Sequence, residues 1–439
     1  MKVILLLGLL SFLGCHSANA QTKLWSLREC CDYAVEHNIS IKQQDNQRRQ
    51  QELQVSTAKN SRLPDLSGSV GQSFSFGRSL TPDNIYVSRN SNGMSLNLST
   101  SMPLFTGFRI PNEIKMSQLN LEAYTADLEK AKNDVRMQVA QAYVQILYDM
   151  EISDVAHRQI EIDSAQVKRL QAFVENGKAS EAELSQQNAA LANSRLTATQ
   201  ADNNTRLALL TLTQLLELPT PDDFTIVRPA PEELSNALAL QVTPDQIYAE
   251  ALGIKPEIVA QQLRLKAYNH NIKIAKSAHY PTLSFGANMG TNYNSAMPNS
   301  MGRQFDGNFA QGFSLNLNVP IFNRFQTRNR VRDAIIQRET QQLQVENTKK
   351  TLYKEIQQVY YNALNAQTKE KSSMEALQSS KDAFTLMQAK YENGKATMTE
   401  FNEAKNNYLK AESDLVQARY ENLYQHALLE FYRGRELTF

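Results

Sequence analysis

The sequence is poor in cysteine, tryptophan and net charge. It has three Cys and one Trp in 439 residues, and 46 Lys and Arg residues balance 45 Asp and Glu residues. Three Cys cannot build a disulfide framework, and a net charge of +1 gives no electrostatic reason to expect nucleic acid as a partner. After the N-terminus no window holds 18 apolar residues, so we expect no transmembrane helix. What remains is a helical or mixed protein whose function depends on its architecture.

Motifs of catalysis and of cofactor binding are also missing. The six His are scattered without an H-x-x-x-H spacing, and there is neither a P-loop nor a nucleophile elbow. Cys30 and Cys31 are adjacent in a helical pattern, where they are expected to be small packed residues. Met297 and Met301 are too few for a soft-metal site. We therefore predict no enzyme activity, no cofactor and no metal.

The N-terminus has the pattern of an export signal. Lys2 precedes an apolar run over 3–14, and Ala18-Asn19-Ala20 matches an A-x-A cleavage site. This predicts a signal peptide over 1–20. The alternative is lipidation at Cys15, which follows a loose version of the bacterial lipobox. We favour cleavage after Ala20, and in either case the mature chain is exported.

The chain contains two copies of one unit, because three motifs recur at a constant offset of 217 residues. The recurring segments are Pro64-Asp65-Leu66-Ser67 with Pro281-Thr282-Leu283-Ser284, Pro103-Leu104-Phe105 with Pro320-Ile321-Phe322, and Glu175-Asn176-Gly177-Lys178-Ala179 with Glu392-Asn393-Gly394-Lys395-Ala396. A constant register over this length indicates duplication. The predicted organisation is a first repeat over 21–217, a linker over 218–243 and a second repeat over 244–439.

Each repeat begins with a predicted helix and continues into two predicted strands. Helical spacing covers 27–60 and 244–277, and both helices are expected to end before Pro64 and Pro281, because the residue before a proline disfavours the helical conformation. Period-two alternation of apolar and small polar residues follows in four segments, within the predicted hairpins 64–104 and 281–321. Pro103 and Pro320 are expected to end the strand ladders where helices take over.

The alternating segments favour a transmembrane β-barrel. Strands of about ten residues with one apolar face are typical of such barrels. A soluble antiparallel sheet on a core gives the same alternation. We prefer the barrel because the polar faces are small and uncharged, and because long polar loops over 78–93 and 294–308 join the strands.

Long helices complete each repeat. Segments 111–176 and 328–393 are helical without interruption, Gly177 and Gly394 break them, and shorter helices return over 180–217 and 396–433. A helix of about 66 residues spans roughly 100 Å, which two shorter helices stacked end to end would match. The Pro-rich linker 218–243 is then expected outside the stack at mid-height.

Four strands cannot close a membrane barrel, whose smallest known examples have about eight strands. An open edge has no hydrogen-bond partner in lipid. The strands are therefore expected to be shared among subunits, and this argument alone leaves a dimer and a trimer open.

With both repeats, the Pro-Leu-Phe-x-Gly-Phe element at 103–108 and the Gly-containing tips, the sequence resembles the TolC-like outer-membrane efflux protein family. One departure is Asn323-Arg324 in place of Thr106-Gly107. The resemblance implies a mixed α and β membrane protein: a homotrimer whose 12-stranded β-barrel, with four strands per chain, continues into a long periplasmic α-helical barrel. It also implies the outer membrane of a Gram-negative bacterium, a periplasmic adaptor protein and an inner-membrane transporter of RND, ABC or MFS type.

The expected function is the exit channel of a tripartite efflux pump. Two alternatives stay open: a type I protein-secretion duct of the same fold, and a pore-free exported coiled-coil scaffold. The resemblance implies that the adaptor docks at the tips, which comprise Asn176, Gly177, Lys178, Asn393, Gly394 and Lys395.

Acidic residues follow the tips. Glu183 and Glu400 are equivalent under the repeat, and Glu403 lies one turn beyond Glu400. Facing inward in a symmetric oligomer, they would form carboxylate rings at a constriction, which is the candidate gate; such rings favour cations and raise each other's pKa. The alternative is that they are solvated acids which complement a helix dipole.

Overall fold

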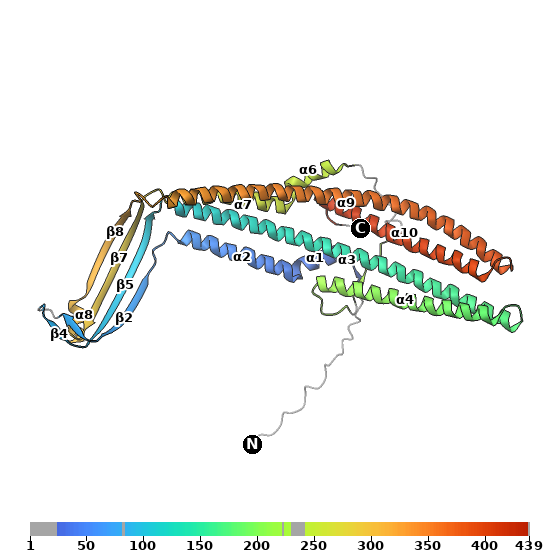
Figure 1. Ribbon diagram of the computed structural model, residues 1–439, viewed down its shortest axis with the longest axis horizontal. Helices are drawn as coiled ribbons and strands as arrows, with labels where there is room; N and C mark the ends of the chain where they lie inside the picture. The colour runs from blue at the N-terminus through green and yellow to red at the C-terminus, as the bar shows by residue number, and fades with distance from the viewer. Residues whose placement is uncertain (1–23, 81–83, 222–223, 230–241, 438–439) are drawn as a thin grey trace, which may run out of the picture.

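The computed structural model describes residues 24–80, 84–221, 224–229 and 242–437, and the chain forms one elongated body with a sheet at one end (Figure 1). The predicted signal peptide 1–20 and Cys15 lie outside the described residues. So does much of the predicted linker 218–243.

The two halves repeat the same order of helices. Four helices of the second half each begin 217 residues after a counterpart in the first half. The pairs are α1 (Leu27–His37) with α6 (Pro244–Ile254), α2 (Ile39–Asn60) with α7 (Pro256–Ser277), α3 (Arg109–Glu175) with α9 (Gln326–Glu392), and α4 (Glu181–Leu215) with α10 (Met398–Tyr432). The predicted long and returning helices are confirmed, and each of their ends lies within two residues of its predicted position.

The first predicted helix of each repeat is interrupted, so the expectation of continuous helices over 27–60 and 244–277 was wrong. Asn38 (φ −59°, ψ 131°) and Lys255 (φ −71°, ψ 122°) leave the helical conformation. Pro256 explains the second break, because a proline disfavours the helical conformation of the residue before it. At the first break Asn38 accepts a hydrogen bond from the Ser40 amide and so starts a new helix.

Four antiparallel strands form the sheet, in the order β2-β5-β7-β8. They are β2 (Ser67–Ser75), β5 (Ser91–Phe105), β7 (Thr282–Asn294) and β8 (Ala310–Asn318), as the alternation predicted. The connecting loops are more ordered than expected. A small hairpin of β3 (Arg78–Leu80) and β4 (Tyr86–Ser88) lies within 78–93, and α8 (Met301–Gly307) lies within 294–308.

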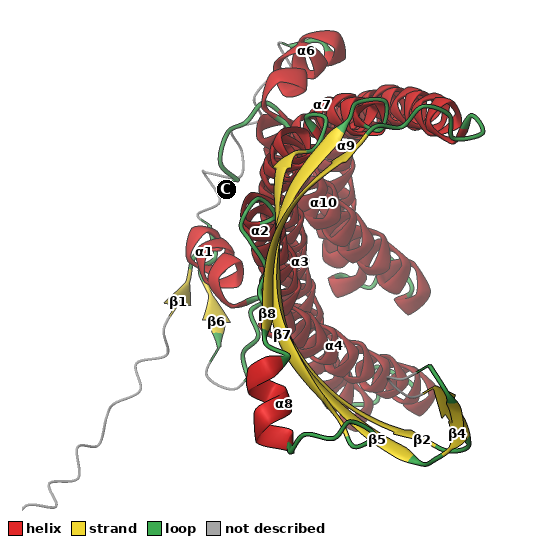
Figure 2. Cartoon of the chain, turned by 90° about the vertical axis from the view of Figure 1, so that its left-hand side faces the viewer, coloured by secondary structure: helices red, strands yellow, loops and turns green. Residues whose placement is uncertain are grey.

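The sheet is curved and largely uncovered (Figure 2). Val70 is 70% exposed and Phe313 is 78% exposed, although both belong to the apolar alternation. The outer strands β2 and β8 each pair with only one neighbour among the described strands. Apolar side chains and unpaired backbone edges therefore remain available for a further partner.

The helices form a layer in which the shorter helices pack along the two long ones, α3 and α9 (Figure 1). α3 packs against α4 toward the tip and against α2 toward the sheet, as the length argument predicted. α9 packs in the same way against α10 and α7. The two halves meet where α3 lies against α7 and, nearer the tips, where α3 lies against α10, and they also meet in the sheet, where β5 pairs with β7.

A buried cluster at mid-height joins the first half to the chain between the repeats. β1 (Leu24–Trp25) pairs in parallel with β6 (Thr225–Ile226), a contact that the sequence did not predict. The Tyr143 hydroxyl on α3 reaches both segments, at 3.1 Å from the Trp25 carbonyl oxygen and 2.7 Å from that of Val227. Burial raises the pKa of Tyr143, so this hydroxyl keeps its proton.

At the strand-to-helix junctions the prolines play two different roles. Pro103 lies inside β5, opposite Ser284, and a register shift follows it. The expectation that Pro103 ends the ladder was therefore wrong: a bulge accommodates its missing amide donor. Pro320 follows the end of β8, and Pro64 and Pro281 lie between a helix and a strand.

Candidate docking and gating site at the helical tips

The turn between α3 and α4 is held by its own backbone. Gly177 adopts a left-handed conformation (φ 66°), its amide donates to the Val174 carbonyl at 2.9 Å, and the Lys178 amide donates to the Phe173 carbonyl at 2.8 Å. This is a Schellman arrangement, which favours glycine at that position. The Asn176 side chain adds a bond to the Ala172 carbonyl at 2.7 Å.

The turn between α9 and α10 has the same geometry. Gly394 (φ 69°) donates to Tyr391 at 3.0 Å, Lys395 donates to Lys390 at 2.8 Å, and the Asn393 side chain donates to Ala389 at 2.7 Å. The three residues at each tip are exposed. Both tips are therefore hydrogen-bonded local turns whose lysine and asparagine are exposed to solvent.

The acids beyond the tips close capping boxes. The Glu183 carboxylate accepts from the Ser180 amide at 3.2 Å, and the Glu400 carboxylate accepts from the Thr397 amide at 2.7 Å. Bonds from the Thr397 amide and hydroxyl lower the pKa of Glu400. Glu403 is exposed. Within one chain, Glu183 and Glu400 therefore act as acids at a helix start, as the alternative to the carboxylate ring proposed. The ring itself concerns an assembly of several chains and stays a prediction.

The two tips lie side by side. Leu170 of the first hairpin and Met398 and Phe401 of the second form one buried cluster. Arg169 pairs with Glu392 at 3.2 Å across the same contact. The two helical hairpins therefore contact each other just behind their tips.

A buried polar cluster lies behind the tips, and the sequence analysis missed it. The Asp163 carboxylate on α3 is fully buried and forms an ion pair with Lys405 of α10, whose side chain is 2% exposed. Gln187 of α4 donates to the same carboxylate at 3.0 Å, and Ser194 donates to its other oxygen. The sequence carries no local signal for it, because Asp163 and Lys405 lie 242 residues apart and meet only through packing of α3 against α10.

The family model for outer membrane efflux protein matches residues 31–217 and 247–435, which is most of the chain. The chain belongs to the outer membrane efflux protein family. This confirms the resemblance drawn from the sequence, and with it the outer-membrane location.

Individual relatives share about a quarter of their residues with this chain over the matched part. The chain is 25% identical over 289 residues to the outer membrane efflux protein BepC of Brucella suis, covering 65% of this chain and 58% of that protein. It is 27% identical over 252 residues to the probable efflux pump outer membrane protein TtgC of Pseudomonas putida, covering 57% and 50%. The matches thus span only about half the length of these relatives. Their names describe efflux proteins and not enzymes.

Solved structures match over nearly the whole chain. The outer membrane protein VceC of Vibrio cholerae aligns with a TM-score of 0.76 at 18% identity, covering 94% of this chain and 96% of that one. The CmeC outer membrane channel of Campylobacter jejuni aligns with a TM-score of 0.78 at 19% identity, covering 94% and 87%. The efflux family members therefore share this fold of tandem repeats.

Within the described ranges, no helix is both long enough and apolar enough to cross a membrane. The same part of the chain holds no group of three His, Cys, Asp or Glu side chains placed to bind a metal ion.

Proposed function

We propose that this chain is the outer-membrane exit channel of a tripartite efflux pump and that it works as a homotrimer. Three copies contribute twelve strands to one barrel, and their helices form a tube across the periplasm. Substrates pass through it passively, delivered by an inner-membrane transporter of RND, ABC or MFS type and a periplasmic adaptor. Family membership and the shared fold support this proposal.

Unequal burial at equivalent positions of α3 and α9 carries the proposal. Leu119 on α3 is 7% exposed, whereas Ile336, at the same position of α9, is 59% exposed. α3 is covered by α7 of the second half. The repeat therefore predicts that α9 is covered by α2 of a neighbouring copy, which would bury Ile336 as Leu119 is buried.

The sheet edges support the same arrangement. β5 of the first half pairs with β7 of the second, so β8 is expected to pair with β2 of the next copy. The register of this contact follows from the observed pair of Asn97 on β5 with Gly290 on β7. The repeat equivalent of Asn97 is Ser314 on β8, and that of Gly290 is Ser73 on β2, so Ser314 is expected opposite Ser73 of the next copy. Repeated around a ring, this pairing leaves no open edge in lipid.

The tips are the proposed docking surface for the adaptor. Both are exposed, both have the same backbone geometry, and the contacts around Phe401 hold them next to each other. Three copies would present six tips at one end of the tube. Glu183, Glu400 and Glu403 lie close to this end, where acidic side chains would act on cations that enter the channel.

Single-channel conductance of the detergent-purified protein in planar bilayers tests the proposal. We expect a cation-preferring pore for the native chain, and a lower cation preference for the double variant Glu400→Gln/Glu403→Gln. Glu36→Gln, which changes an exposed acid of α1 far from the tips, is the matched control and should conduct like the native protein. Unchanged selectivity in the double variant would reject the acidic ring but keep the channel. A monomeric particle that stays in solution without detergent would reject the channel.

A further inference from the structure

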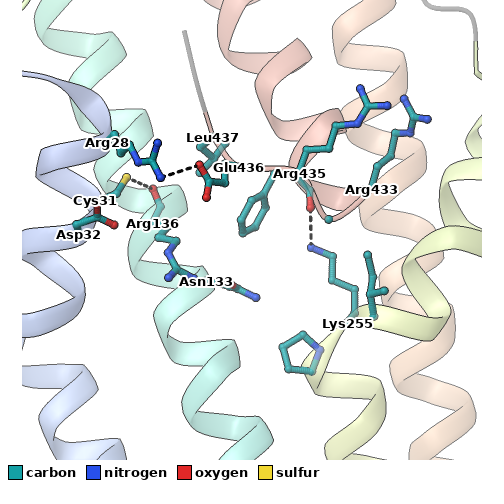
Figure 3. Close-up of a pocket in the computed structure, with 14 residues that line it drawn as sticks. Arg28, Cys31, Asp32, Asn133, Arg136, Lys255, Arg433, Arg435, Glu436 and Leu437 are labelled. Atoms are coloured by element: carbon teal, nitrogen blue, oxygen red, sulfur yellow. Dashed lines mark hydrogen bonds and ion pairs between the residues drawn. The ribbon is translucent and has the colours of Figure 1, made fainter.

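A pocket at mid-height lies where the end of the second half meets the start of the first. Its volume is about 480 Å³, within the range of small-molecule sites. Its walls come from α1, α3, the break between α6 and α7, and the segment after α10 (Figure 3). In Figure 2, α1 and α6 lie on the convex side of the curved layer, away from its hollow face.

Positive charge dominates the lining of this pocket. Its charged residues are Arg28, Arg136, Lys255, Arg433 and Arg435 against Asp32 and Glu436. Three of the five cations have carboxylate partners. Arg28 lies 3.6 Å from Glu436, Arg433 lies 2.9 Å from both Glu250 and Glu430, and Arg435 also pairs with Glu430.

Arg136 and Lys255 are the two cations left over. Across the described ranges of the chain, no carboxylate oxygen lies within 4 Å of a side-chain nitrogen of either residue. Arg136 donates to the neutral Asn133 side chain at 3.0 Å. Lys255 is 6% exposed, and its ammonium has one hydrogen bond, to the Phe431 carbonyl at 3.3 Å, and contacts the rings of Phe431 and Tyr432. A buried ammonium with unused donors is costly unless an anion pairs with it.

The repeat supplies an internal comparison for Lys255. Its equivalent, Asn38, precedes α2, caps that helix through its side chain, and donates to the Leu215 carbonyl at 3.1 Å. Lys255 keeps the analogous bond to the end of α10 but leaves α7 without a side-chain cap. A cation at a helix N-terminus is unfavourable because it opposes the helix dipole. The second repeat thus has an unfavourable residue where the first repeat has a capping one.

We propose that this pocket binds a small oxyanion, a phosphate or carboxylate group, between Arg136 and Lys255 at the uncapped start of α7. One such group would pair with both leftover cations and would take the place of the missing cap. Burial lowers the pKa of Lys255, and the charges of Glu257, Glu355 and Asp134 only partly offset this effect. A bound anion would oppose that shift. The inference is independent of the proposed transport function.

Binding of inorganic phosphate and of citrate to the full-length protein in detergent tests this proposal. Titrations at constant ionic strength would follow ³¹P line broadening for phosphate and the unfolding temperature for both anions, with chloride as the reference. We expect saturable binding and an unfolding temperature that rises with either anion over chloride. Absence of binding by both anions would overturn the proposal.

Two variants locate the site. Lys255→Asn copies the residue of the first repeat and is expected to fold, and Arg136→Gln removes the second cation from a different helix. Each should weaken binding at least tenfold. Arg49→Gln is the matched control, because Arg49 also donates to an Asn side chain three residues earlier, at 3.5 Å, on the exposed face of α2. Undiminished binding in both pocket variants, or an equal loss in the control, would overturn the proposal.

Discussion

Lys405 of α10 donates to the fully buried carboxylate of Asp163 on α3, and this ion pair joins the second half of the chain to the first. Removing one member leaves the other charged and buried, which typically costs about 3–5 kcal/mol. We therefore expect Lys405→Met to destabilise the helical end strongly. Asp163→Leu/Lys405→Met, which leaves no buried charge, should recover most of the loss.

Thermal unfolding followed by helical circular dichroism measures both variants. Lys132→Met is the control, because Lys132 pairs with Glu129 at 2.7 Å on the surface, where a pair contributes about 0–1 kcal/mol. A single variant no less stable than this control would show that the buried pair does not hold the two halves together.

Gly107 is expected to tolerate no side chain. It has a positive φ of 61°, and a β-carbon built on it would lie 2.5 Å from the Ser277 carbonyl oxygen. Gly107→Ala should cost about 1–2 kcal/mol from the left-handed backbone alone, and more from the clash. Its unfolding temperature should therefore fall clearly below that of the native protein.

Arg324 provides the converse case. It stands where Gly107 stands in the first repeat, is exposed, and has a φ of 52° without being glycine. Arg324→Gly should relieve about 1 kcal/mol of backbone strain. A loss of stability in the same unfolding assay would mean that the arginine side chain makes contacts that outweigh this strain.

The stability of the first turn of α10 should depend on pH. The bonds from Thr397 lower the pKa of Glu400, so the carboxylate stabilises this turn at pH values above its ordinary pKa of 4.5. That stabilisation should disappear as the pH falls through the lowered value. Amide hydrogen exchange of the first turn of α10 between pH 6 and pH 3 measures it.

Two variants separate the cap from a general acid effect in that experiment. Glu400→Gln should largely abolish the pH dependence of protection, whereas Glu403→Gln, in the same helix, should retain it. Identical pH profiles for the native chain and Glu400→Gln would reject the capping account.

Ile336 and Leu119 should respond differently to truncation. Ile336→Ala is expected to remove about 2 kcal/mol from each subunit interface, more than a tenfold weakening of association, with little effect on the fold of one chain. Leu119→Ala should instead lower the stability of the chain itself by about 2–5 kcal/mol. Light scattering across a dilution series and thermal unfolding distinguish these effects, and an unchanged dissociation of Ile336→Ala would argue against the α9 interface.

Much of this fold could be predicted because its signals are local and occur twice. The helix stops at Gly177 and Gly394 follow from the need for a left-handed residue there, and the strands follow from period-two alternation. The helix break at Lys255 could also have been predicted, because Pro256 follows it. The break at Asn38 was harder to predict, because a capping asparagine also fits within a polar helix.

Features that depend on contacts distant in the sequence could not be predicted. Strands β1 and β6 have two residues each and pair across about 200 residues of sequence. Both are too short to show the period-two alternation that predicts a strand. Asp163 and Lys405 are ordinary helix-surface residue types, and only the packing of α3, α4 and α10 buries them together. The same applies to Arg136 and Lys255, which belong to opposite halves of the chain.

Disulfide cross-linking between Ser73→Cys and Ser314→Cys, placed together in one chain, tests the central claim most directly. The repeat puts these positions opposite each other on neighbouring copies, so mild oxidation should give a covalent trimer on a non-reducing gel. Ser69→Cys with Ser314→Cys, four residues out of register, should cross-link poorly, and the native chain, with its buried Cys30 and Cys31, provides the blank. A trimer specific to the in-register pair is the predicted result. No cross-link, or equal cross-linking in both registers, would contradict the shared barrel.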